Sequence, residues 1–158
     1  MTEGIQRAIR HEAGHATAAL HLGFSVERVS FVNGVPRTEL FLDSPEKTRH
    51  ERFIVLAAGI AAEQFFYGDY DVTASGADAA MIAERGGCAI ETYLPEALQI
   101  IRLNESCLRH LVGTLTHRLQ EESAEASFVA GASLEDLAAP SFELLSAREI
   151  QDVWQKKH

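Results

Sequence analysis

The chain has 158 residues, a length that predicts a single domain spanning residues 1–158. Its 14 basic and 23 acidic residues give a net charge of −9, which argues against nucleic acid or an anionic membrane as partner, because both are bound through clustered Lys and Arg. The chain also shows only two cysteines, no signal-peptide pattern and no apolar stretch long enough to cross a bilayer, so we expect a cytoplasmic protein.

The first 42 residues predict a helix followed by a hairpin. The helix covers Glu3–Leu22 and ends at Gly23, a residue that tolerates the left-handed cap conformation. A strand is expected over Val26–Val32, and the following Asn33-Gly34 is a strong signal for a two-residue hairpin turn. Thr38–Leu42 would be the returning strand, which a proline just before it pushes toward a sheet edge.

The rest of the chain predicts helices. Ser44-Pro45 opens one that runs to Tyr67 and stops at Gly68. A third runs from Ser75 toward Tyr93 and is interrupted by a glycine pair, and a fourth region runs from Pro95 to Glu122. A short helix at Ala147–Gln155 follows a capping box. The polar stretches Asp69–Ser75 and Ser123–Ser133 are expected to be loops or frayed ends. The predicted fold is mostly α, with a small β-sheet or hairpin near the N-terminus.

The segment His11–His15 reads HEAGH and lies inside the first predicted helix. Histidines four residues apart share one face of a helix and can bind one Zn²⁺. Glu12 is rotated by about 100° from His11, beside such a metal, where it can take a proton from water. The alternative is a histidine pair packed in an alanine-rich core face. A zinc site also needs a third protein ligand from elsewhere in the chain.

HEAGHATAAL followed by VERVSF resembles the peptidase domain of the FtsH-type ATP-dependent zinc metalloproteases. AAGIAAEQFFYG (Ala57–Gly68) is similar to the family's AGRAAEE-like helix, and VTASGAD (Val72–Asp78) to its TGAxxD-like segment. LLSAREIQDVW (Leu144–Trp154) is similar to the closing helix. The resemblance is specific from His11 to Glu84 and weaker, in the same order, beyond it. It implies a zincin-like helical peptidase domain.

The resemblance also assigns roles to residues. It implies that His11, His15 and Asp78 bind one zinc ion per chain and that Glu12 is the general base. Glu63 would be a carboxylate that bonds a ligand imidazole. Ser75-x-x-Asp78 is also a capping-box pattern, in which the aspartate serves a helix start, and the two interpretations are compatible.

The chain departs from the family pattern at several places. Ile60 stands where the family has an arginine, and the middle of the TGAxxD-like motif differs at residues 74–77. Residues 84–98 do not resemble the strand-like stretch that usually follows. The sequence contains neither the family's ATPase domain nor its membrane anchor, so we expect an isolated peptidase-like domain.

The sequence therefore predicts a zinc metalloendopeptidase that hydrolyses flexible or unfolded protein. An extended peptide substrate would add to the predicted strand edge, with Thr38, Leu40 and Leu42 as candidate contacts. Two alternatives stay open. The chain could be a catalytically quiet relative whose groove binds a protein, or a regulatory domain that needs a separate ATPase or a homo-oligomeric assembly.

Overall fold

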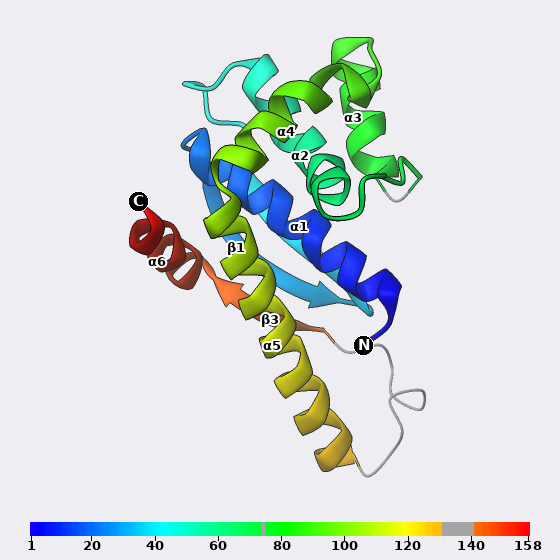
Figure 1. The fold of residues 1–158 in the computed structure, drawn as a ribbon, viewed down its shortest axis with the longest axis vertical. Helices are drawn as coiled ribbons and strands as arrows, with labels where there is room; N and C mark the ends of the chain where they lie inside the picture. Colours follow the sequence, from blue (N-terminus) through cyan, green and yellow to red (C-terminus); the bar gives the residue numbers. More distant parts are fainter. Residues whose placement is uncertain (74, 131–140) are drawn as a thin grey trace.

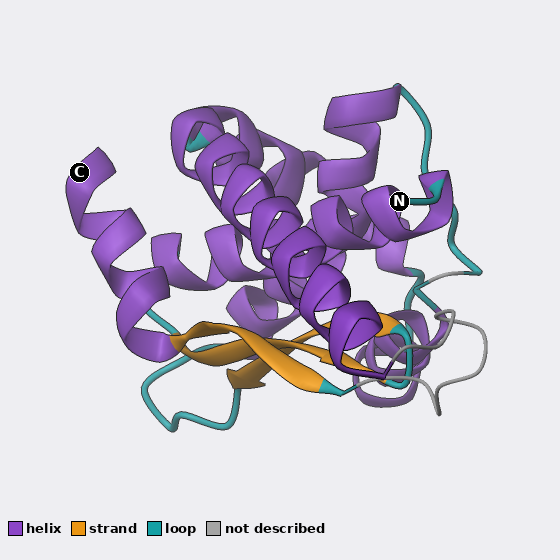
Figure 2. Ribbon diagram, turned by 90° about the horizontal axis from the view of Figure 1, so that it is seen from below, coloured by secondary structure: helices purple, strands orange, loops and turns teal. Residues whose placement is uncertain are grey.

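A computed structural model describes residues 1–73, 75–130 and 141–158, without the side chains of 126–130. Within these ranges the protein is mostly helical and carries one small antiparallel sheet, which confirms the expected fold class (Figure 1). The strands gather on one side of the helices (Figure 2). Ala74, one of the departures from the family motif, lies outside the described residues.

The N-terminal helix and hairpin form as the sequence predicts. Helix α1 spans Glu3–His21, and strands β1 (Ser25–Val32) and β2 (Val35–Phe41) pair antiparallel. Asn33 and Gly34 have φ of 51° and 81°, as a type I′ turn requires of both central residues. Strand β2 lies at a sheet edge, because the strand order is β2-β1-β3.

The third strand, β3 (Phe142–Ser146), was not predicted. It pairs antiparallel with β1, so the C-terminal part of the chain completes a sheet begun by the hairpin. Helix α6 (Ala147–Lys157) follows directly and confirms the predicted capping box. The Ser146 side chain accepts from the Glu149 amide, and the Glu149 side chain accepts from the Ser146 amide.

Helix α2 (Arg49–Tyr67) begins later than predicted. Its N-cap is Thr48, which forms a reciprocal capping box with Glu51, so the expected start at Ser44-Pro45 is wrong. The carbonyl of Ser44 instead accepts a hydrogen bond from Arg52. The predicted stop at Gly68 is confirmed, with φ of 76° in the left-handed region.

The helices after α2 are shorter than predicted or differently divided. Helix α3 (Gly76–Gly86) ends at the glycine pair, because Gly87 adopts φ of 65° and closes it; a 3₁₀ helix (Ile90–Tyr93) follows instead of a continuation. The predicted fourth region is two helices, α4 (Leu94–Leu103) and α5 (Glu105–Ala130). They separate at Asn104, whose backbone N–H and side-chain amide both donate to the Ile100 carbonyl.

The polar stretch 123–133 was expected to be a loop or a frayed end. Helix α5 continues through it to Ala130, and residues 131–133 lie outside the described part of the chain.

The core of the described residues is centred on the contact between α1 and α2. Both helices are rich in alanine there, and their backbones approach closely at Gly14, where an added Cβ would lie 2.4 Å from the Ala58 carbonyl oxygen. Buried leucines of α5 and residues of the sheet complete one apolar cluster. No helix in the described ranges is long and apolar enough to span a membrane.

Candidate metal centre

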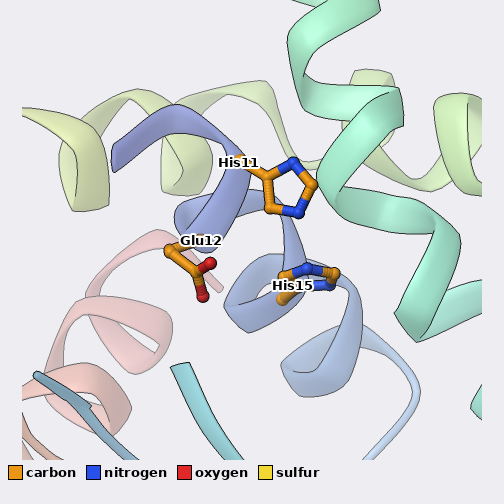
Figure 3. A group of neighbouring side chains, drawn as sticks. All are labelled: His11, Glu12 and His15. Carbon is orange, nitrogen blue, oxygen red and sulfur yellow. The ribbon is translucent and has the colours of Figure 1, made fainter. Parts of the chain in front are cut away.

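Helix α1 presents the HEAGH residues as their spacing predicts. The rings of His11 and His15 lie one above the other, with centroids 4.7 Å apart, and Glu12 is turned to the side (Figure 3). Both histidines are buried, and Glu12 is partly exposed. The potential ligand atoms of these three residues all lie within 4.8 Å of one another, so the group could hold a metal ion.

Helix α2 makes room for the histidines with a glycine. An added Cβ at Gly59 would lie 2.3 Å from Nε2 of His11, closer than side-chain atoms approach one another. The His11 ring therefore fills the space that any other residue at position 59 would occupy. This contact explains why a glycine stands in the middle of the alanine-rich segment.

The hydrogen bonds of the two rings set which nitrogen faces outward. Nδ1 of His15 lies 2.8 Å from the Val55 carbonyl oxygen, and Nδ1 of His11 lies 2.7 Å from Oε1 of Glu63. Both partners accept hydrogen bonds, so each Nδ1 carries the proton when the ring is neutral. The lone pair of each neutral ring is then on Nε2, where a metal can bind it.

Glu63 is a buried carboxylate with several partners, 1% exposed. Besides His11, it accepts hydrogen bonds from Nε of Arg7 at 2.6 Å and from the Asp71 amide at 3.2 Å. Burial alone would raise the pKa of Glu63, but the bonds to His11 and Arg7 outweigh it and hold the pKa below its ordinary value. The carboxylate therefore stays charged and fixes the orientation of the His11 ring.

Asp78, in the first turn of α3, faces both imidazoles. Its Oδ2 lies 3.6 Å from Nε2 of His11 and 3.3 Å from Nε2 of His15. Ligands about 2.0–2.1 Å from a tetrahedral zinc ion are separated by about 3.3 Å, so both distances are close to those between two ligands of one ion. Two imidazoles and a carboxylate also form a donor set that zinc accepts, and the residues fit the metal.

The capping-box interpretation of Asp78 does not hold. Ser75 is the N-cap of α3, but its side chain makes no capping hydrogen bond. The Ser75 hydroxyl is buried and has no hydrogen-bond partner among the described residues. It lines the same groove as Asp78, so this part of the groove offers a polar atom without a protein partner.

Without a metal, the pKa values of these residues favour protonated histidines beside a charged aspartate. Burial lowers the pKa of His11, but the nearby carboxylates of Asp78 and Glu63 outweigh this effect and raise the pKa to about 9. Burial also lowers the pKa of His15, but the combined effects of Asp78 and Glu12 outweigh it and raise the pKa. Burial raises the pKa of Asp78, but the two histidines lower it further, to well below its ordinary value.

Glu12 connects the helix to the edge of the sheet. The backbone amide of Thr38 in β2 donates to Oε2 of Glu12 at 2.6 Å, and the Thr38 hydroxyl donates to the Glu12 carbonyl oxygen at 3.0 Å. The second carboxylate oxygen, Oε1, is left for another donor. Since the Thr38 amide points away from β1, the outer edge of β2 faces the histidines.

The two histidines, Glu12 and Asp78 line one groove of about 400 Å³. The structure brings together in its walls every residue predicted as ligand, base or substrate edge: His11, Glu12, His15, Thr38, Leu40, Leu42 and Asp78. Glu63 lies behind the groove, in contact with the ring of His11.

Several residues of the site were not predicted. Arg7 precedes His11 by four residues on the same helix face, a spacing that could have pointed to it. Gly59 could have been found from its position opposite the histidines once the helices were paired. The Val55 carbonyl is a backbone group, and no feature of the sequence indicates it.

No protein-family model matches the chain, and no curated protein matches it significantly.

Proposed function

We propose that this protein is a zinc-dependent endopeptidase, akin to the peptidase domain of the FtsH-type metalloproteases, that cleaves flexible or unfolded protein. The observation that carries the proposal is the convergence of two Nε2 atoms and one carboxylate oxygen, 3.3 and 3.6 Å apart, in a groove. His11, His15 and Asp78 would hold the zinc. The order of the matching motifs along the chain supports the same assignment.

Zinc bound by these residues would supply a Lewis acid that activates water and polarises a peptide carbonyl. Glu12 would take the proton of the attacking water at Oε1 and deliver it to the leaving amine. The Thr38 amide holds Oε2 of Glu12, so the carboxylate keeps its position during both transfers. Glu63 and the Val55 carbonyl keep the two rings in one orientation.

The edge of β2 would bind the substrate backbone. An extended peptide adds to an exposed strand edge through main-chain hydrogen bonds, which set its register without requiring one sequence. Leu40 and Leu42 line the groove beside this edge and offer apolar contacts to substrate side chains. A folded protein cannot present such a strand, so substrates would be flexible or unfolded, supplied in the cytoplasm with or without a separate ATPase or a homo-oligomeric assembly.

The replacement of Glu12 by Gln tests the proposal. The Glu12→Gln side chain keeps its shape and can still accept from Thr38, but it cannot take a proton near neutral pH. We expect unchanged zinc content and thermal unfolding, and a loss of casein hydrolysis of about a hundredfold to ten-thousandfold. Elemental analysis, calorimetry and a digestion assay on the same samples measure all three.

His110→Ala is the matched control, since His110 is exposed on α5. It should retain both zinc and activity. Equal casein hydrolysis by the wild type and Glu12→Gln would contradict the proposal. Zinc binding without hydrolysis by the wild type would instead favour the quiet or partner-dependent alternative.

A further inference from the structure

A second cavity, of about 370 Å³, lies beside the metal groove. It is formed by the first two turns of α2, by α3 and by the chain after β2. Leu42 and Leu56 line both the cavity and the groove, so the two spaces share a wall. A peptide in the groove would therefore run close to this cavity.

The cavity combines apolar walls with positive charge. Phe53 and Met81 add to the apolar wall, and Arg49, Arg52 and Arg85 supply three guanidinium groups. The protein has a net charge of −9, so three arginines around one small space form a locally positive region. Asp43 is exposed and lies 3.9 Å from Arg85, with which it forms a weak ion pair.

The arginines of α2 are not placed to stabilise their own helix. Arg49 and Arg52 lie in its first turns, where the helix dipole disfavours positive charge. Arg52 is held in position, because its Nε donates to the Leu42 carbonyl at 2.6 Å and a terminal nitrogen donates to the Ser44 carbonyl at 2.9 Å. Arg49 and Arg85 are exposed at the cavity and accessible to a ligand.

We propose that this cavity selects an acidic side chain of the peptide substrate, with glutamate favoured. The methylene groups of glutamate would contact the apolar wall, and its carboxylate would meet the guanidinium groups, which pair with carboxylates in a fixed geometry. This inference rests on the proposed function, since it takes the groove to be the substrate site, and it names the substrate class: unfolded segments rich in glutamate.

Equilibrium binding to the inactive Glu12→Gln protein tests the proposal without requiring hydrolysis. The probes are fluorescent, C-terminally amidated decapeptides of one neutral sequence, in which a single Glu replaces Gln at each position in turn. At one position the Glu peptide should bind about fivefold more tightly than the Gln peptide, the size expected for exposed ion pairs. The difference should shrink at 0.5 M salt, because salt screens exposed charges.

Adding Arg49→Gln and Arg85→Gln together should remove the preference for Glu, whereas Arg148→Gln, an exposed arginine on α6, should leave it unchanged. No preference at any position, or no binding of any peptide, overturns the inference. Casein hydrolysis without a Glu preference would refute this inference alone, and a Glu preference without hydrolysis would refute the proposed peptidase alone.

Discussion

The two sides of the candidate metal centre are built very differently. The imidazoles lie between α1 and α2, where α2 buries every residue from Phe53 to Glu63. The carboxylate comes from α3, in which Ile82 is the single buried residue of the helix. The histidines are fixed by packing, by a carbonyl and by a buried carboxylate, whereas Asp78 is presented by a helix with little buried surface.

This difference separates stability from metal affinity. Changes at the contact of α1 with α2 disturb the largest part of the core and should affect folding and metal together. Changes on α3 remove a ligand but little buried apolar surface, so they should affect the metal far more than the fold. The following predictions test this separation, from the largest expected effect on stability to the smallest.

Of these changes, Gly59→Ala should lower the stability most, and it should also weaken zinc binding by the histidines. Alanine normally stabilises a helix interior by about 1 kcal/mol relative to glycine. Here its Cβ would lie 2.3 Å from Nε2 of His11. Overpacking costs about 1–3 kcal/mol, so the free energy of unfolding should fall by about 2 kcal/mol at most, and the displaced ring should no longer bind zinc. Chemical denaturation and elemental analysis measure both effects.

Gly113→Ala is the matched control for this change. Gly113 lies in α5 with no atom within 4 Å of an added Cβ, so the same substitution should stabilise by about 1 kcal/mol and leave zinc content unchanged. A Gly59→Ala protein that gains stability and retains zinc would refute the close packing of α2 against His11.

Asp78→Asn should weaken zinc binding without unfolding the protein. The neutral amide is a poor zinc ligand, so zinc affinity should fall by at least about a hundredfold. Above about pH 9, where His11 is neutral in the metal-free fold, the free energy of unfolding of the metal-free protein should change by only about 1 kcal/mol, since Asp78 is partly exposed. Zinc titration with a competing chelator and denaturation in EDTA measure the two quantities. Unchanged zinc affinity would exclude Asp78 as a ligand.

The pH dependence of stability should differ with and without zinc. The pKa of His11 is raised to about 9 in the metal-free fold. Its protonation therefore stabilises the metal-free protein fully below about pH 6.5, and this stabilisation is lost as the pH rises through about 9. Zinc must displace that proton, so its apparent affinity should increase over the same interval.

Thermal unfolding from pH 6 to pH 9 checks this prediction. The midpoint in EDTA should fall with rising pH, and the difference between the midpoints with excess zinc and in EDTA should grow over the same interval. Parallel curves in the two conditions would show that zinc does not compete with protons at His11.

Local signals in the sequence predicted much of the fold. The alanine-rich start of the chain, the Asn33-Gly34 turn and the Ser146 capping box each depend on residues within a few positions, and the structure confirms all three. Where two local signals compete, the sequence does not decide. Ser44-Pro45 and Thr48 both resemble a helix start, and Thr48 prevails because Glu51 completes its capping box.

Long-range features escaped prediction. The five residues Phe142–Ser146 are too short for a clear period, and their partner β1 is more than a hundred residues earlier in the chain. At the site, the histidine pair and the glutamate follow from helical spacing alone. The aspartate was reached only through the order of motifs, and the arginine cavity depends on how α2 and α3 approach each other, which no local pattern encodes.

The position of β3 has a consequence for synthesis of the chain. Strand β1 is the central strand, and it holds β2, the wall of the groove, on one side and β3 on the other. Until residues 142–146 leave the ribosome, β1 presents an open edge of unpaired backbone groups, which is prone to join strands of other molecules. A nascent chain can therefore form the histidine pair early, but its sheet closes only after residues 142–146 have been synthesised.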